Sequence, residues 1–289
     1  MFPAPFDYHR AASVKEALGL LGQFGDDAKL LSGGQSLLPM MKLRLAQPAH
    51  LIDIGGLREL AAIKEEAGKI TIGAATTHNQ VETSDLVRAR LGVLGECAAE
   101  IGDVQVRNRG TIGGSLVHAD PAADYPAAIL ALEAEIKLES ASGSRTVKAQ
   151  DFFVDLLTTA IKPGEILTQV SFVAPAAGTG SAYVKHPQPA SGFAIVGVAA
   201  LLKLDARGNC ESVRVGITGL GPKAFRANGV EAALAGKAPS AEAIAAAASH
   251  AADRVEPMSD IHASADFRAE LARVYTRRAL EKALSRCKR

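Results

Sequence analysis

The chain has 289 residues and a formal net charge of +1, with 48% hydrophobic and 22% charged residues. This length fits about two domains, and the apolar share allows a sizeable core, which excludes wholesale disorder. The near-neutral charge gives no general attraction to nucleic acid or anionic membranes, and no apolar stretch approaches the roughly 20 residues that span a bilayer.

The first half of the chain predicts alternating helices and strands. Ser13 and Glu16 form a capping pair that opens a helix, and Gly25 ends it. The hydrophobic pattern then predicts strands over residues 28–31, 50–54 and 69–72. Helices are expected after Thr76 or Thr77 and over 91–101. A long glycine-containing segment, 102–124, follows without a predicted helix or strand.

The second half predicts a helix over 126–132, strands over 134–138, 146–148 and 166–170, and a linker at 175–180. Beyond the linker we expect a hairpin of strands 194–205 and 211–218, then helices over 230–235, 241–252 and from Ser264 onward. Residues 266–289 carry 8 basic and 3 acidic side chains. We interpret these cations as favoured by the helix dipole, with a partner-docking patch as the alternative. Because no regular βαβ alternation is present, the fold class is α+β.

The three cysteines, Cys97, Cys210 and Cys287, are far apart in the sequence. This spacing excludes a disulfide framework and a CxxC-type metal or iron–sulfur site within the chain. The opening MFPAPFDYHR lacks the basic and apolar regions of a secretory signal. We therefore expect a cytoplasmic globular protein without a bound metal, a nucleic-acid partner or a membrane span.

Two glycine pairs follow apolar runs. The first is in Ser32-Gly33-Gly34-Gln35-Ser36, and the second is in Thr111-Ile112-Gly113-Gly114-Ser115. Paired glycines let successive backbone N–H groups point into one concavity that binds phosphate oxygens, and the hydroxyls add donors. Each loop alone is more often a simple turn, and the two together suggest two phosphates, hence a pyrophosphate, with simple turns as the alternative. Neither the G-x-G-x-x-G nor the P-loop pattern is present.

An acidic segment follows the second glycine pair. Asp120 and Asp124 precede Pro126, so either carboxylate is a candidate cap for the helix that begins there. The alternative is that Asp124 accepts hydrogen bonds from ligand hydroxyls. Spacing alone favours the cap.

Three segments carry a family resemblance: SGGQSLLPMMKLRLAQPAHLIDI, TIGAATTHNQV and VRNRGTIGGSLVHADPAADYPAA. Together with FDYHR and GEILTQV, they resemble the FAD-binding medium subunits of molybdenum-containing hydroxylases. This family includes the medium subunit of aerobic carbon monoxide dehydrogenase and the FAD-binding subunit of xanthine dehydrogenase. The resemblance covers essentially the whole chain. It implies a PCMH-type FAD-binding domain over 1–176, with subdomains of about 1–56 and 57–176. A smaller C-terminal domain over 177–289 would hold a three-stranded antiparallel sheet and helices.

The resemblance also implies roles for individual residues. Non-covalent FAD would lie with its pyrophosphate between the two glycine loops, 32–36 and 111–115. Asp124 would bind ribityl or ribose hydroxyls, and the flavin side would contact Ile101, Leu167, Lys185 and Phe193. Lys185 is then a cation near the flavin, with an exposed lysine at a strand end as the alternative. Molybdopterin and [2Fe-2S] clusters would reside on a large and a small partner subunit, in a dimer of heterotrimers.

The chain departs from the carbon monoxide dehydrogenase pattern at a few positions. Gln35 stands where that pattern has His, Phe193 replaces Tyr, and the segment 186–191 differs. These changes are compatible with FAD binding, but they do not support carbon monoxide as the substrate. His118 and His186 are weak candidates for catalytic bases, so no catalytic residue is assigned. The competing functions are a stand-alone FAD oxidase or reductase and a nucleotide-binding module without redox activity.

Overall fold

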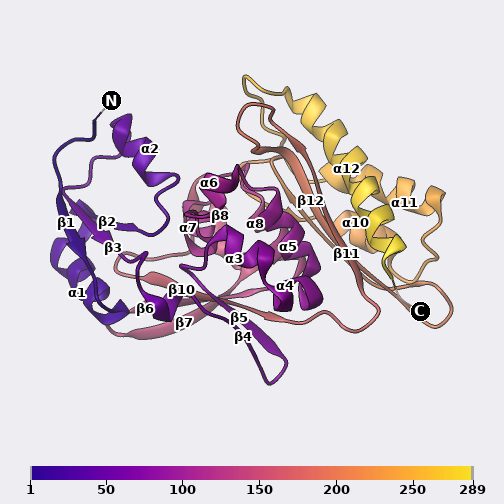
Figure 1. Cartoon of the computed structure of the whole chain (residues 1–289). Coiled ribbons are helices and arrows are strands. Elements are labelled where there is room, and N and C mark those ends of the chain that lie inside the picture. The colour runs from indigo at the N-terminus through magenta and orange to yellow at the C-terminus, as the bar shows by residue number, and fades with distance from the viewer. Residues whose placement is uncertain (1, 288–289) are drawn as a thin grey trace.

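The computed structural model describes residues 2–287, which form three main sheets arranged in chain order across the molecule (Figure 1) and a small two-stranded sheet. The first sheet has the parallel order β1-β3-β2, built from β1 (Asp7–Arg10), β2 (Ala28–Leu31) and β3 (His50–Asp53). Helix α1 (Val14–Phe24) connects β1 to β2, and its N-cap is Ser13, as the sequence predicts. The first glycine loop leaves the carboxyl end of β2 and leads into α2 (Leu37–Lys42).

The second sheet is antiparallel, in the order β4-β5-β10-β6-β7. Its strands are β4 (Ile63–Glu66), β5 (Lys69–Gly73), β6 (Glu135–Ser140), β7 (Gly143–Lys148) and β10 (Ile166–Val173). Six helices lie between β5 and β6: α3 (His78–Thr83), α4 (Asp85–Arg90), α5 (Gly92–Ala99), α6 (Val104–Arg107), α7 (Ile112–His118) and α8 (Tyr125–Ala131). Five of them, all except α6, form the largest core with apolar side chains of β5, β6 and β10. A short excursion between β7 and β10 contains α9 (Ala149–Phe152), β8 (Phe153–Asp155) and β9 (Thr158–Thr159).

The segment 102–124 contains two helices, α6 and α7, that the hydrophobic pattern did not predict. Each is short, and each begins at a side-chain cap. The Asp103 carboxylate accepts a hydrogen bond from the Val106 amide, and the Thr111 hydroxyl accepts one from the Gly114 amide. Helices of four and seven residues are too short for a clear hydrophobic period, so capping is the sequence signal that identifies them.

The third sheet is antiparallel, in the order β11-β12-β13-β14. It contains β12 (Ala194–Leu204) and β13 (Cys210–Thr218), which the hydrophobic pattern predicted. It also contains β11 (Gly180–Pro187) and the two-residue β14 (Phe225–Arg226), which the pattern did not predict, so the sheet has four strands and not the three that the family resemblance implies. Helices α10 (Asn228–Leu234), α11 (Ala241–Ala248) and α12 (Ala265–Ser285) cover its outer face and enclose a second core (Figure 1).

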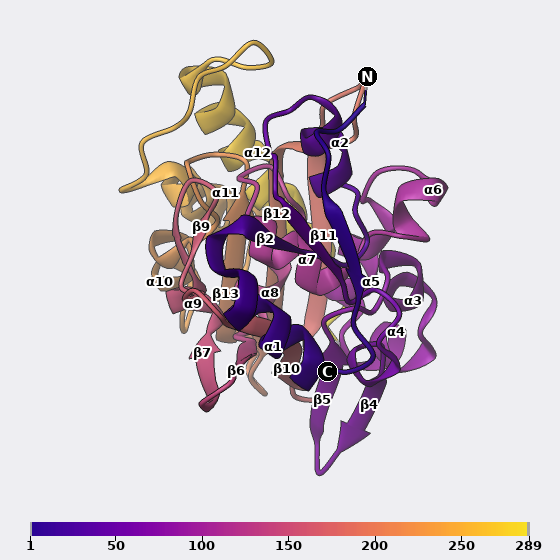
Figure 2. The same ribbon diagram turned by 90° about the vertical axis from the view of Figure 1, so that its left-hand side faces the viewer.

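The inner face of this third sheet lies against helices α5 and α8 of the middle region. The approach is so close that a Cβ atom at Gly216 on β13 would collide with the Ala127 carbonyl oxygen on α8. Figure 2, in which the left-hand side of Figure 1 faces the viewer, shows the N-terminal region in front of the middle one. The N-terminal sheet, the helical middle region and the C-terminal sheet therefore pack against one another in this order. The segments that the sequence analysis assigned to the cofactor belong to these contacting regions.

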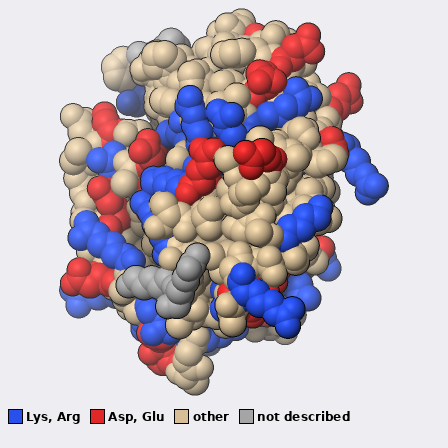
Figure 3. All heavy atoms as spheres, turned by 90° about the vertical axis from the view of Figure 1, so that its right-hand side faces the viewer, with Lys and Arg blue, Asp and Glu red and all other residues tan. Residues whose placement is uncertain are grey.

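The last helix continues beyond Tyr275, where its apolar stripe seemed to end, to Ser285. Its cations do not form a single basic patch. Lys282 and Arg286 both pair with Glu96 on α5, and Arg273 pairs with Glu270. Lys, Arg, Asp and Glu side chains are interspersed on this face (Figure 3). The end of α12 thus attaches to the middle region, which neither sequence-based interpretation anticipated. Lys288 and Arg289 lie outside the described residues. Over residues 2–287, no helix has the length and apolar character to cross a membrane.

Candidate functional site

A cavity of about 560 Å³ lies where the N-terminal sheet, the middle region and the loop between β11 and β12 meet. This volume is within the range of small-molecule and cofactor sites. Thirteen of the fifteen residues proposed from the sequence line it: Ser32, Gly33, Gly34, Gln35, Ser36, Ile101, Thr111, Gly113, Gly114, Ser115, Asp124, Leu167 and Phe193. The other two, Ile112 and Lys185, do not. Ile112 is fully buried in the middle core, and Lys185 lies behind Asp124.

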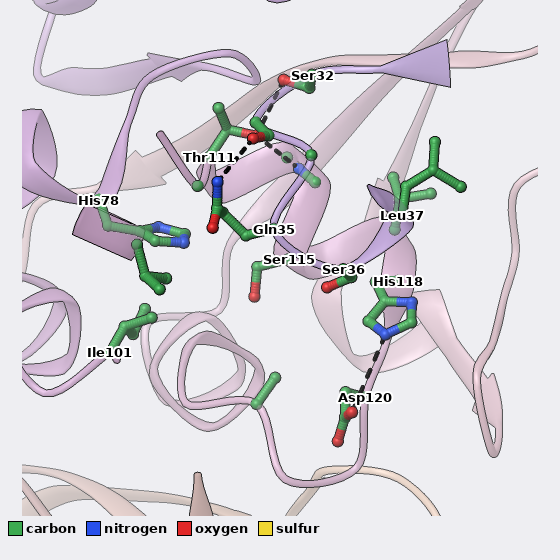
Figure 4. A pocket seen from close by; sticks show the side chains of 18 of the residues that line it. Ser32, Gln35, Ser36, Leu37, His78, Ile101, Thr111, Ser115, His118 and Asp120 are labelled. Carbon is green, nitrogen blue, oxygen red and sulfur yellow. Dashed lines mark hydrogen bonds and ion pairs between the residues drawn. The ribbon is translucent and has the colours of Figure 1, made fainter. Parts of the chain in front are cut away.

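The two glycine loops touch each other across one side of the cavity (Figure 4). A Cβ atom at Gly33 would collide with the Arg109 carbonyl oxygen, so only glycine allows this approach. The Ser32 and Thr111 hydroxyl oxygens are 3.0 Å apart, and either hydroxyl can donate to the other. Two segments about 80 residues apart in sequence thereby form one continuous polar surface.

The two loops offer different donors to a ligand. In the first loop, the backbone amides of Gly33 through Ser36 have no acceptor among the described residues. In the second loop, the amide of Gly113 donates to the Ala74 carbonyl, and that of Gly114 donates to the Thr111 hydroxyl. The expectation of free amides therefore holds for the first loop only. The second loop contributes the hydroxyls of Thr111 and Ser115, and Gly113 packs tightly on Ala74, directly after β5.

A buried charge pair stands at another part of the cavity wall. Asp124 is 4% exposed, and its carboxylate accepts hydrogen bonds from the Tyr183 hydroxyl at 2.5 Å and the Lys185 ammonium at 3.2 Å. Burial raises the pKa of Asp124 from 3.8 to about 6, against the opposing attraction of Lys185. The pair holds two charges in a poorly solvated place, an arrangement that proteins maintain only with further hydrogen bonds.

Two sequence-based expectations about these residues are wrong. Asp124 occupies the N-cap position of α8 but makes no capping bond, and the Asp120 carboxylate accepts from the nearby Ala122 amide instead. Neither carboxylate caps the helix. The alternative of an exposed Lys185 is also wrong, because only 2% of its side chain is exposed.

The structure adds a residue that the sequence analysis missed. His78 lies at the start of α3, lines the cavity and is 4% exposed (Figure 4). Its Nδ1 atom is 3.3 Å from the Tyr125 hydroxyl. Burial, with a smaller effect of Arg107, lowers the pKa of His78 from 6.5 to about 4, so its ring is neutral at pH 7. The sequence feature that could have identified His78 is its position directly after Thr77, whose side chain caps α3 in a capping box with Gln80.

The other two histidines considered from the sequence differ in position. His118 lines the cavity, with Nε2 4.0 Å from an Asp120 carboxylate oxygen. His186 is absent from the cavity lining, and its Nδ1 is 3.1 Å from the Tyr275 hydroxyl on α12. Gln35, where the family pattern has His, folds back and donates to the Gly33 carbonyl at 3.2 Å. Within residues 2–287, no group of three or more His, Cys, Asp or Glu side chains is placed to hold a metal ion.

These features define a class of protein: a two-domain binder of an elongated phosphate-containing cofactor, with glycine loops beside apolar walls. Comparison with known families narrows this class. Residues 4–174 match the family described as FAD binding domain in molybdopterin dehydrogenase, and residues 181–283 match the carbon monoxide dehydrogenase flavoprotein C-terminal domain.

Individual relatives match over the full chain. The carbon monoxide dehydrogenase medium chain of Hydrogenophaga pseudoflava is 45% identical over 99% of this chain and 100% of its own length. The subunit alpha of the 6-hydroxypseudooxynicotine dehydrogenase complex of Paenarthrobacter nicotinovorans is 39% identical, covering 100% and 97%. A solved Hydrogenophaga pseudoflava carbon monoxide dehydrogenase, lacking the Mo-pyranopterin moiety of its cofactor, superposes with a TM-score of 0.97, 46% identity and full coverage of both chains. The chain belongs to the FAD-binding subunit family of the molybdopterin dehydrogenases.

Proposed function

We propose that this chain is the FAD-binding, electron-transfer subunit of a molybdenum hydroxylase complex. The observation that carries the proposal is the joining of the two glycine loops, with free amides at 33–36 and hydroxyls at Ser32 and Thr111, along one cavity. This donor set suits a pyrophosphate. The apolar side chains that line the rest of the cavity suit the ring systems of a dinucleotide.

The residues present fit FAD, and we assign them accordingly. The loops 32–36 and 111–115 hold the pyrophosphate, Asp124 accepts from ribityl or ribose hydroxyls, and Ile101, Leu167 and Phe193 contact the flavin side. Ile112 supports its loop from the core, where it is fully buried. When bound, FAD supplies the ability to take up and release electrons, while the protein orients it and limits its access to water.

The proposal includes partners. A small subunit with [2Fe-2S] clusters delivers electrons, and a large molybdopterin subunit oxidises the substrate, in a dimer of heterotrimers. Support comes from two relatives, one a dehydrogenase medium chain and the other a subunit of a dehydrogenase complex. We place the complex in the cytoplasm, consistent with the free cysteines Cys97, Cys210 and Cys287. We also propose a domain boundary at about residue 176, between the two matched family regions.

The test is to purify the tagged chain with its natural partners and identify every co-purifying subunit, the flavin and the metals. We expect non-covalent FAD on this chain, with molybdenum and iron on separate chains. Turnover of a small substrate by the isolated chain would instead favour a stand-alone oxidase or reductase. Absence of flavin, together with no gain of thermal stability on adding FAD, would favour a nucleotide-binding module without redox activity. The family membership leaves the oxidised substrate and the final acceptor open, because similar chains serve complexes with different substrates.

A further inference from the structure

The ammonium of Lys185 connects three segments that meet at one part of the cavity. It donates to the Glu100 carbonyl at 2.6 Å, to the Gly192 carbonyl at 2.6 Å and to the Asp124 carboxylate at 3.2 Å. A lysine ammonium has three donors, so all three are used within the protein. No donor remains for a cofactor atom, and Lys185 is absent from the cavity lining.

Each of these acceptors belongs to a residue that lines the cavity or directly precedes one that does. Glu100 directly precedes Ile101, Gly192 directly precedes Phe193, and Asp124 lines the cavity. Glu100 and Asp124 belong to the middle region, whereas Gly192 belongs to the loop between β11 and β12 of the third sheet. The ammonium therefore fixes a loop of one domain against the cavity wall formed by the other.

The loop itself is compact and touches the middle region at one further place. Its amides are held locally, because Gly192 donates to the Gln188 carbonyl at 2.8 Å and Gln188 donates to the Phe193 carbonyl at 2.7 Å. Gly192 lies beside Gly102, close enough that a Cβ atom on Gly192 would be 3.9 Å from the Gly102 Cα atom. Phe193 remains 45% exposed although it lines the cavity, so the position of its ring depends on how this loop is held.

We propose that Lys185 is a positioning residue that holds the 188–193 loop, and with it the Phe193 ring, over the Ile101 end of the cavity without contacting the cofactor. This rests on the proposed function, since it takes FAD to be the ligand. It differs from the role that the family resemblance implies for Lys185, in which the cation stands directly against the flavin. In the present geometry, the charge of Lys185 is compensated by Asp124, and its effect on the cofactor passes through the loop.

A double-mutant cycle distinguishes the two roles. The variants are Lys185→Met, Phe193→Ala and the combination, each made in the full chain, with FAD affinity and iodide quenching of the bound flavin as readouts. If Lys185 acts through the loop, each single change weakens FAD binding by about tenfold and raises quenching. The double variant then binds FAD no more weakly than the single variant with the lower affinity. Multiplying effects would overturn the proposal, because they would mean that Lys185 and Phe193 act on FAD independently.

A second measurement covers the case in which Lys185→Met folds poorly because it leaves Asp124 buried without its partner. The variant Lys185→Met/Asp124→Asn removes both charges, and backbone amide exchange of residues 188–193 is followed in the FAD-free chain. We expect exchange at Gly192 and Phe193 to rise by about tenfold or more. Unchanged exchange would overturn the positioning role whether or not FAD binds. Wild-type chain that binds no FAD would instead refute the proposed function, and the exchange result would still decide the role of Lys185.

Discussion

The hydroxyl oxygens of Ser32 and Thr111 lie 3.0 Å apart, although 79 positions separate these residues in the sequence. The contact joins the end of β2 in the N-terminal sheet to the start of α7 in the middle region. Thr111 also caps α7 by accepting from the Gly114 amide at 3.2 Å. One side chain therefore both begins a helix and connects the two loops that line the cofactor cavity.

Replacing Thr111 with valine keeps the volume and removes both bonds. We expect the apo chain to lose about 1 kcal/mol of unfolding free energy, as for a lost N-cap. FAD affinity should fall by roughly threefold to tenfold, because a neutral hydrogen-bond donor is lost at the ligand. Ser84→Ala is the matched control: Ser84 caps α4 by accepting from the Val87 amide and does not line the cavity. It should lower stability similarly without changing FAD affinity. Equal affinity losses in both variants would contradict the assignment.

Gly114→Val tests whether the second glycine loop holds the pyrophosphate. A Cβ atom at Gly114 would be 2.8 Å from the Thr111 hydroxyl oxygen, in the wall of the cavity. We expect at least a tenfold loss of FAD affinity, measured by titration of the apo chain. Gly19→Ala is the control, because Gly19 is in the interior of α1 and a Cβ atom there meets nothing within 4 Å. It should stabilise the chain by about 0.5–1 kcal/mol and leave flavin binding unchanged. Full flavin occupancy of Gly114→Val would refute the pyrophosphate assignment.

His78 predicts a loss of stability in acid. Its pKa in the folded chain is lowered from 6.5 to about 4, so between these values the unfolded chain binds a proton that the folded chain does not. The contribution of His78 to the unfolding free energy therefore falls as pH falls through this range, by about 2 kcal/mol between about pH 7.5 and pH 5. Urea unfolding of wild-type apo chain and His78→Gln should show the difference between them shrinking as the pH is lowered. Parallel pH curves would contradict the buried neutral ring.

Asp124 predicts the opposite dependence of unfolding free energy on pH. Its pKa in the folded chain is raised from 3.8 to about 6, so between these values the folded chain keeps a proton that the unfolded chain has released. This contribution to stability declines as pH rises from about 4 to 6 and then stays constant. Because the slopes from His78 and Asp124 oppose each other there, the wild-type curve should be flatter than that of either variant. Urea unfolding of Asp124→Asn should show a steeper acid loss than wild type; a curve identical to wild type would show that Asp124 does not titrate in this range.

The local rules predicted much of this chain from short stretches of sequence. Ser13, Thr77 and Ser264 each cap the helix that follows, because a hydroxyl and an amide two or three positions later meet wherever the helix begins. The glycine pairs at 33–34 and 113–114 indicated the cavity wall for a similar reason, since the absence of a Cβ atom is a property of the residue itself. In the third sheet, the hydrophobic period predicted β12, β13 and the helices that follow, but neither β11 nor the two-residue β14.

Only the tertiary structure decided the partners of the buried charges. Spacing favoured Asp124 as a helix cap, yet its carboxylate binds Tyr183 and Lys185, 59 and 61 positions away. Lys185 finds a further acceptor in Glu100, 85 positions away, and Arg286 pairs with Glu96 across the domain contact. A buried charge must be compensated by whichever groups the fold brings to it. Capping and hydrophobic period act within one or two turns of chain and can be predicted from sequence, whereas these pairings arise only when distant segments pack.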